Sequence, residues 1–293
     1  MVMNNRIRKA IFPVAGLGTR FLPVTKVVPK ELLPIIDKPL IHYAFNEAVK
    51  AGIETFIFIT GRGKSNIVDY FDHSPELERH LNSKGNGDII ESLIEDLPKA
   101  GQVVSIRQQK PLGLGHAVLC AKDMIGDDPF AVILPDELLI SDPPCLKIMI
   151  DRYNNTGGHL IAAMEVPKEE TCNYGILDVK SINNDGLIHV NSMVEKPDSK
   201  VAPSCFANIG RYVLDSSIFN SLKNQKPGSG GEIQLTDAIN DSALKTQFHA
   251  QIFDGERFDC GSKIGYLEAN LVLALKRPDL SHKMRAIISN LLK

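Results

Sequence analysis

The most constraining feature of this sequence is a glycine-rich turn that follows a short apolar run near the N-terminus. The run spans Ala10–Ala15 and is typical of a buried strand, and Gly16-Leu17-Gly18 follows it at once. Because glycine has no Cβ, such a turn lets backbone N–H groups crowd around a phosphate. Arg20 and Lys30 then supply fixed positive charge for the same phosphates. The pattern predicts a nucleoside triphosphate site.

The spacing of the glycines excludes two better-known phosphate loops. A P-loop has four residues between its glycines and then Gly-Lys-Ser or Gly-Lys-Thr, whereas a single residue separates Gly16 from Gly18. A dinucleotide fingerprint needs a third glycine three positions after the second, and Phe21 stands there. A Gly-x-Gly pair alone is more often an ordinary turn. The prediction therefore depends on the polar residues that follow the pair, which are Thr19, Arg20, Lys26, Lys30 and Glu31.

The order of the segments after this turn predicts an α/β fold. A helical pattern runs from about Pro39 to Gly52, and a strand rich in β-branched and aromatic residues follows at residues 53–60. Strand, loop, helix and strand in this order favour a parallel sheet. Residues 174–178 and 187–196 flank an Asn-Asn-Asp-Gly turn and indicate a small antiparallel insertion. Further strands are predicted at residues 103–107, 130–134 and 159–166.

Two polar residues lie where predicted parallel strands end, which is the ligand-binding edge of such a sheet. Gln108 follows one strand and precedes a second glycine-rich turn, and its amide can match the donor and acceptor edge of a pyrimidine base. Asp136 ends another strand and is a natural Mg²⁺ ligand facing the phosphate loop. The alternatives are a surface glutamine and an ordinary strand-ending aspartate.

Candidate sugar-binding groups come later in the chain. Glu195 can accept hydrogen bonds from adjacent sugar hydroxyls, and Lys196 can hold a sugar phosphate. The alternative is a solvated surface pair. Arg62 and Lys64 follow the second strand and are interpreted as part of a solvated loop.

Composition narrows the class of partner and the compartment. With 293 residues, 43% of them hydrophobic, the chain suffices for one large α/β domain or two small ones. A net charge of -2 predicts neither a nucleic-acid partner nor a membrane surface. The five cysteines are scattered and form no Cys-x-x-Cys, as expected in a reducing compartment. Because no apolar run resembles a signal peptide or a membrane span, we expect a cytoplasmic protein.

Seven motifs, taken together and in order, resemble the bacterial UTP–glucose-1-phosphate uridylyltransferases, a branch of the sugar nucleotidyltransferases. They fall between about residues 6 and 275 and read AGLGTRFLPVTK, PKELLPIIDKPLI, KPLGLGHAV, ILPDELL, VEKP, GEIQLTDAI and FDCGSKIGYLEAN. The resemblance implies a Rossmann-like three-layer nucleotidyltransferase fold, with a mixed, mostly parallel central sheet and a small antiparallel insertion. We expect one domain over residues 1–293, with a nucleotide-binding half (about 6–166), a sugar-phosphate-binding half (about 167–261) and C-terminal helices (about 262–293).

The resemblance also implies a reaction, in which UTP and α-D-glucose 1-phosphate give UDP-glucose and diphosphate with Mg²⁺ as cofactor. By the same resemblance, Arg20 and Lys30 hold the departing phosphates, and Lys196 holds the phosphate of the sugar. Asp136 and Asp259 are the implied metal ligands, and Gly175 and Glu195 face the glucose. The residues implied to bind the nucleotide are Ala15, Gly16, Leu17, Gly18, Thr19, Gln108 and Gly113.

Two alternatives stay open at this point. A thymidylyltransferase of the same fold would share the mechanism, although the first loop and the GLGHA turn argue against it. A non-catalytic nucleotide-sugar-binding regulator would be expected to lack a charged site residue, and none is missing here. The last predicted helix, from about Asp279 to Leu292, carries an apolar stripe. This stripe could cover the domain or pair with a second subunit, and we expect a homo-oligomer, either a dimer or a tetramer.

Overall fold

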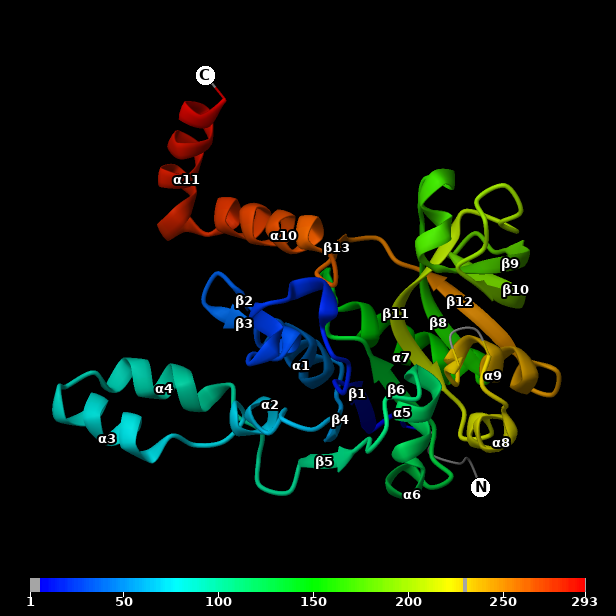
Figure 1. Ribbon diagram of the computed structural model, residues 1–293, viewed down its shortest axis with the longest axis horizontal. Helices are drawn as coiled ribbons and strands as arrows, with labels where there is room; N and C mark the ends of the chain where they lie inside the picture. The colour runs from blue at the N-terminus through cyan, green and yellow to red at the C-terminus, as the bar shows by residue number, and fades with distance from the viewer. Residues whose placement is uncertain (1–5, 229–230, 293) are drawn as a thin grey trace.

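A computed structural model describes residues 6–228 and 231–292, and a nine-stranded β-sheet forms its centre (Figure 1). One half of the sheet is parallel: β1 pairs with β4 and with β6, and β4 pairs with β5. Because β1, β4 and β6 are largely buried from both sides, they read in the sequence as nearly continuous apolar runs, whereas β5 lies at the edge of the sheet and is half-buried. The four strands are β1 (Lys9–Pro13), β4 (Thr55–Thr60), β5 (Val103–Arg107) and β6 (Phe130–Ile133).

The other half of the sheet is mixed. β11 (Phe206–Leu214) runs antiparallel to β6 and to β8 (His159–Glu165), and β12 (Phe248–Ile252) runs parallel to β8. β10 (Leu187–Glu195) and β9 (Gly175–Ile182) form an antiparallel hairpin. The predicted antiparallel insertion is therefore this hairpin, which extends the edge of the main sheet rather than forming a separate body.

Helices cover both faces of the sheet because the strand residues alternate between two apolar cores. Phe12, Phe56 and Phe58 belong to one core, together with α1 (Leu40–Lys50) and α7 (Cys145–Thr156). The intervening isoleucines of the same strands belong to the other core. That core is closed by α5 (Leu114–Cys120), α8 (Ile218–Asn224) and α9 (Leu235–Ala243), and the short α6 (Lys122–Ile125) follows α5. The predicted three-layer α/β class is confirmed.

Small elements join the sheet to the site. β7 (Glu137–Ile140) pairs with β13 (Glu256–Asp259), and β2 (Pro34–Ile35) pairs with β3 (Lys38–Pro39). These strands were not predicted, because they are too short to show a clear period in the sequence. Figure 1 also shows a helical hairpin that projects from the body. It consists of α3 (Pro75–Ser83) and α4 (Gly87–Glu95), and it follows α2 (Asn66–Asp69).

The C-terminal helices stand away from the sheet. α10 (Lys263–Lys276) leads into α11 (Pro278–Leu291), which extends from the body at the top left of Figure 1. No residue of α11 that the structure describes is buried, so the predicted apolar stripe does not cover the domain. Neither these helices nor any other in the described residues is long and apolar enough to cross a membrane.

Candidate active site

The predicted phosphate loop follows β1 and turns back on itself. Gly18 has a φ of 66°, in the left-handed region that favours glycine. A Cβ at this position would lie 3.1 Å from Cγ2 of Thr25, whose hydroxyl donates a hydrogen bond of 2.7 Å to the Gly18 carbonyl. A short 3-10 helix, η1 (Thr19–Phe21), continues from the turn. The second glycine is therefore required both by its backbone conformation and by the close approach of Thr25.

Charged groups from distant segments meet beside this loop. Lys30 begins the 3-10 helix η3 (Lys30–Leu32), and its Nζ lies 2.6 Å from Oδ2 of Asp136, which lies between β6 and β7. Arg20 donates a 3.3 Å hydrogen bond to the carbonyl of Gly261. Burial alone would raise the pKa of Asp136, but Lys30 and Arg20 offset it and hold the pKa below its usual value. Asp136 is thus an anion held among cations.

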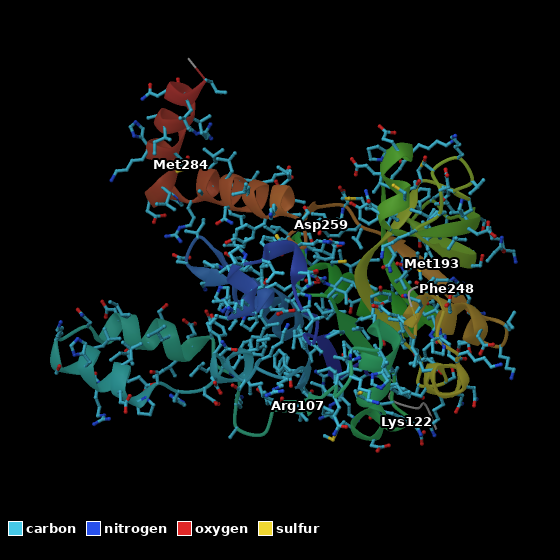
Figure 2. The ribbon with its side chains drawn as sticks, in the orientation of Figure 1. Arg107, Lys122, Met193, Phe248, Asp259 and Met284 are labelled. Atoms are coloured by element: carbon cyan, nitrogen blue, oxygen red, sulfur yellow. The ribbon has the colours of Figure 1, made fainter. Side chains whose placement is uncertain are left out.

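The two predicted metal ligands converge at Gly261. A Cβ on this glycine would lie 2.9 Å from Oδ2 of Asp136 and 3.0 Å from Oδ1 of Asp259. Asp259 ends β13, and its Oδ1 accepts a hydrogen bond of 2.9 Å from the Gly261 amide. Figure 2 labels Asp259 beside the start of α10. A side chain at position 261 would fill the space between the carboxylates, so glycine keeps it open.

Glu31, the residue after Lys30, forms a buried ion pair with Lys64. The prediction that Lys64 belongs to a solvated loop is therefore wrong. Lys64 is 8% exposed rather than solvated, and its Nζ lies 2.9 Å from Oε2 of Glu31, which is 1% exposed. Arg62 is exposed, as predicted. A buried carboxylate needs a counter-charge, and Lys64 supplies it. A glutamate within the largely apolar segment VPKELLPII was the sequence signal for such a partner.

A cavity of about 520 Å³ lies over the phosphate loop, and Gln108 lies on its wall. The Gln108 Nε2 donates a 3.1 Å hydrogen bond to the Gly113 carbonyl and lies 2.9 Å from Nδ1 of His116. These contacts fix the amide on the cavity wall. Nine of the predicted residues line this cavity: Ala15, Gly16, Leu17, Gly18, Thr19, Lys30, Gln108, Gly113 and Asp136.

A second cavity of about 260 Å³ adjoins the first. Its walls include Gly175, Glu195 and Lys196, the three residues predicted to face the sugar phosphate. Oε2 of Glu195 accepts a hydrogen bond of 2.8 Å from the Thr236 hydroxyl, at the start of α9. The two cavities share the wall residues Leu114, Leu134 and Glu232. Sequence reasoning did not single out Glu232 or Thr236, although both belong to the GEIQLTDAI motif.

Lys196 projects from a strained backbone position at the end of β10. Its φ is 46°, which is uncommon for a residue with a side chain. The side chain is 57% exposed, and its Nζ lies 3.2 Å from Oε1 of Glu195. The lysine therefore reaches the rim of the second cavity without a buried partner. Of the predicted site residues, Arg20 and Asp259 line neither cavity and lie instead around Gly261.

A buried arginine that sequence reasoning missed holds the loop of Asp136. Arg211 of β11 is 1% exposed. It donates a 3.0 Å hydrogen bond to the Leu134 carbonyl and a 2.8 Å hydrogen bond to the Glu137 carbonyl, on either side of Asp136. Its charge is balanced by Oε2 of Glu47 at 2.8 Å. An arginine inside the apolar strand sequence NIGRYVL was the available signal.

Glu137 is held separately by Arg257 of β13. Oε2 and Oε1 of the carboxylate lie 2.8 and 3.0 Å from Nε and Nη2 of this arginine. The guanidinium also lies 4.7 Å from the ring centroid of Tyr174, a wall residue of the second cavity. Burial raises the pKa of Glu137 to about 7, although Arg257 acts in the opposite direction. Arg257 thus links the Asp136 loop to the second cavity.

Comparisons with known proteins agree with this geometry. The family model described as nucleotidyl transferase matches residues 9–275. The UTP–glucose-1-phosphate uridylyltransferase of Staphylococcus epidermidis is 46% identical over 286 residues, which cover 98% of this chain and 99% of that protein. A UTP-bound UGPase from Acinetobacter baumannii superposes with a TM-score of 0.89 at 44% identity, covering 96% of this chain and 98% of that one.

A further solved structure, a UDP-glucose pyrophosphorylase complexed with UDP-glucose, is 44% identical and superposes with a TM-score of 0.82. The match covers 92% of this chain and 100% of that one. Both the family model and the near-complete overlap with relatives agree with the motifs read from the sequence. The chain therefore belongs to the nucleotidyl transferase family and, within it, to the UTP–glucose-1-phosphate uridylyltransferases.

Proposed function

We propose that this chain transfers the uridylyl group of UTP to α-D-glucose 1-phosphate, releasing diphosphate and forming UDP-glucose. The observation that carries the proposal is the pair of adjoining cavities with shared walls. One contains the glycine-rich loop, Gln108 and Lys30, and the other contains Glu195 and Lys196. Such an arrangement suits a nucleotide and a sugar phosphate that meet at their phosphates. The printed names of the relatives support the same two substrates.

The chemistry requires positioning and charge neutralisation rather than a general base. A phosphate oxygen of the sugar phosphate is already ionised near neutral pH, and it attacks the α-phosphorus in line while diphosphate leaves. Lys196, at the rim of the sugar cavity, would hold the attacking phosphate. Lys30 and Arg20, beside the glycine-rich loop, would hold the departing phosphates. Gln108 and Gly113 would read the uracil, and Glu195 would accept hydrogen bonds from glucose hydroxyls.

The carboxylates near Gly261 fit a divalent cation. Asp136 and Asp259 approach the same point, and two carboxylates together with substrate phosphates are a typical Mg²⁺ environment. No cluster of three His, Cys, Asp or Glu suited to a metal occurs in the described residues, so substrate oxygens and water would complete the shell. Bound there, Mg²⁺ would neutralise charge on the phosphates. Lys30 would then exchange its contact with Asp136 for one with the departing phosphates.

Metal binding can be measured apart from turnover. We expect Mn²⁺ to bind the complex with UTP, as followed by electron paramagnetic resonance, and we expect Asp259→Asn to weaken this binding at least tenfold. Asp254→Asn is the matched control, because Asp254 is an exposed aspartate in the loop before β13. Equal Mn²⁺ affinity in the two variants would remove Asp259 from the metal site.

The activity is tested by diphosphate release from the full chain with Mg²⁺ and glucose 1-phosphate, in parallel reactions with UTP, dTTP, ATP and GTP. We expect strong release with UTP and little with the others. Release with dTTP that equals or exceeds release with UTP would keep the mechanism but assign the chain to the thymidylyltransferases. If folded protein binds UTP but releases no diphosphate with any nucleotide, the chain is a non-catalytic binding protein and the proposal fails.

We also propose a cytoplasmic location for the enzyme. The five cysteines carry free thiols in the structure, as a reducing compartment would keep them.

A further inference from the structure

A larger cavity of about 620 Å³ lies outside the candidate active site. It shares no lining residue with the two substrate cavities. Its walls come from the end of α7, from β9 and β10, from β12, and from the segment that follows α9. In Figure 2, Phe248, a wall residue on β12, is labelled at the right of the molecule, away from Asp259. The reaction proposed above gives this cavity no role.

The charge of the cavity favours an anion. Lys180 and Lys245 line it, and no aspartate or glutamate is among the described residues of its walls. Neither lysine has an ion-pair partner within the part of the chain that the structure describes. Lysine is a compact point charge suited to phosphate. Both lysines are exposed, and two ammonium groups on one concave surface without a carboxylate favour a ligand that carries phosphate.

A buried histidine in the same wall lacks a partner on one side. His249 is 6% exposed, and its Nε2 lies 3.3 Å from Oε1 of Gln247, which can only accept a hydrogen bond. In the tautomer that makes this contact a hydrogen bond, the proton is on Nε2 and Nδ1 carries a lone pair. In the described residues Nδ1 has no hydrogen-bond partner. A buried acceptor without a donor is costly. Because Nδ1 is itself covered, a turn of the ring toward the cavity would let it accept from a ligand hydroxyl.

The neighbouring side chains extend this polar wall. His189 stands directly opposite His249 across the β10–β12 ladder, and their rings meet edge to face with centroids 4.8 Å apart. Asn183 and Thr246 add an amide and a hydroxyl to the cavity. Cations on one part of the wall and hydrogen-bonding groups on another match a molecule that combines a phosphate with hydroxyls.

Two elements run from this cavity to the sugar cavity. β10 lines the larger cavity with His189 and reaches the sugar cavity with Glu195. α9 begins at the sugar cavity with Thr236 and ends beside the larger cavity. The two elements are joined midway, because Asn240 Oδ1 accepts from the Met193 amide at 2.8 Å and Asn240 Nδ2 donates to the Met193 carbonyl at 2.7 Å. These two hydrogen bonds make β10 and α9 a continuous structural connection between the two cavities.

We propose that this cavity binds a phosphate ester that carries hydroxyl groups, such as a sugar or polyol phosphate, and that its occupancy changes the affinity of the sugar cavity. The lysines bind the phosphate, and Nδ1 of His249 accepts from a hydroxyl of the ligand. β10 and α9 carry the effect to Glu195 and Thr236. By thermodynamic linkage, a ligand at one site changes binding at the other by the same factor in both directions.

Binding is tested by isothermal titration calorimetry of the full chain with glucose 6-phosphate. We expect saturable binding, and we expect the double variant Lys180→Ala/Lys245→Ala to raise the Kd at least tenfold. The matched control is Lys84→Ala/Lys99→Ala, which removes two exposed lysines far from the cavity walls and should leave the Kd unchanged. Absence of binding at millimolar concentration, or equal binding by the two double variants, would overturn the proposal.

The hydroxyl requirement is tested with inorganic phosphate as the second probe. We expect it to bind several-fold more weakly than glucose 6-phosphate, and we expect His249→Leu to reduce this difference. Equal affinity for both probes in the unaltered chain would overturn the assignment to a hydroxylated ester. Because His249 is buried and the variant could misfold, the comparison of the two probes on the unaltered chain stands without it.

Coupling is tested by the KM for glucose 1-phosphate with and without glucose 6-phosphate, an arm that rests on the proposed function. We expect the KM of the unaltered chain to change severalfold and that of Lys180→Ala/Lys245→Ala to change little. The same change in both proteins would mean that glucose 6-phosphate acts in the active site, and it would refute the coupling. The calorimetry does not depend on turnover, so failure of the proposed function would not affect the binding result.

Discussion

At the scale of single residues, a substitution of Lys196 should lower the rate of transfer without lowering the stability of the fold. Its side chain is 57% exposed and its ion pair with Glu195 lies at the surface. A surface pair of this kind stabilises a fold by at most about 1 kcal/mol. We expect Lys196→Ala to lower the rate of uridylyl transfer by about 10²–10³, the usual cost of removing one charge-stabilising group, while the urea midpoint changes little.

The matched control for this prediction is Lys200→Ala, in the exposed segment that follows β10. Both variants lose one exposed lysine, so a difference in steady-state rate reports position rather than net charge. Normal turnover by Lys196→Ala would refute its role at the sugar phosphate.

Arg211 is predicted to affect both stability and catalysis. Removing one partner of a buried ion pair costs about 3–5 kcal/mol, because the other charge is left without compensation. We expect Arg211→Met to lower the free energy of unfolding by this amount in urea denaturation. Arg211→Met/Glu47→Leu should be destabilised by less than the sum of the single variants, with a coupling of about 0.5–3 kcal/mol.

The double variant also shows what Arg211 does for Asp136. The hydrogen bonds from Arg211 to the carbonyls of Leu134 and Glu137 are lost in both variants. Turnover should therefore stay low in the double variant even where stability recovers. Recovery of turnover together with stability would mean that Arg211 only balances Glu47.

The residues that could be predicted lie at recognisable places in the chain, whereas the residues that were missed belong to ion pairs between distant positions. The positions of Gln108 and Asp136 could be predicted because each follows a strand end, where the topology of a parallel sheet gathers ligands, and Lys30 was predicted from its place after the glycine-rich turn. The partnership of Lys64 with Glu31 joins residues 33 positions apart, and that of Arg211 with Glu47 joins residues 164 apart. Such pairings depend on packing, which a single sequence does not display.

At the scale of elements, the strands of the main sheet could be predicted more readily than the small strands around the site. β5 has the bounds predicted for it, and β4, β6 and β8 differ from prediction by one or two residues at an end. β7 and β13 were missed, although they deliver Glu137 and Asp259 to the site. Each spans four residues, too few to show a period of two.

His159 supplies a prediction about how β8 and α9 are held together. Its Nε2 lies 2.8 Å from the Ser242 hydroxyl, and its Nδ1 accepts a hydrogen bond from the Asp215 amide at 3.3 Å. Burial lowers the pKa of His159 to about 4, although Asp215 acts in the opposite direction. The folded pKa lies below the ordinary value of 6.5, so the fold favours the neutral ring. Its stabilising effect is therefore complete above about pH 6.5 and is lost as the pH falls toward 4.

We expect the unaltered chain to lose about 2 kcal/mol more stability between pH 7 and pH 5 than His159→Gln, since the variant has no ring to protonate. Urea denaturation at the two pH values measures the difference. His282→Gln removes an exposed histidine and should keep the pH dependence of the unaltered chain. Parallel pH profiles for the unaltered chain and His159→Gln would contradict the role given to this histidine.

At the scale of the whole molecule, a continuous sheet joins the two predicted halves. β6 of the nucleotide half pairs with β11 of the sugar half, and the β9–β10 hairpin continues the same sheet to its edge. The site lies where the halves meet, because β7 and β13, one from each half, bring Asp136 and Asp259 together. The residues expected to bind the nucleotide and those expected to bind the sugar phosphate could be named from the sequence. The pairing of β7 with β13, which brings the two groups together, depends on the folded chain.

The last prediction concerns α11, which the structure places outside the body. Its residues are not buried, and Ile287 and Leu291 are 50% and 79% exposed. Ending the chain after Lys276 removes α11 and the exposed ion pair between Arg277 and Asp37, and such pairs contribute about 1 kcal/mol or less. We expect the shortened chain to fold, with a free energy of unfolding within about 1 kcal/mol of the full chain at equal assembly state.

Sedimentation velocity of the same variant tests the expected homo-oligomer. If the apolar side chains of α11 pack against a second copy, the full chain sediments as a dimer or tetramer and the shortened chain as a smaller species. The rate of transfer per chain should stay within twofold, because no residue of α11 lines either substrate cavity. An unchanged oligomer would place the contact on another surface, and a large loss of turnover would show that assembly supports the site.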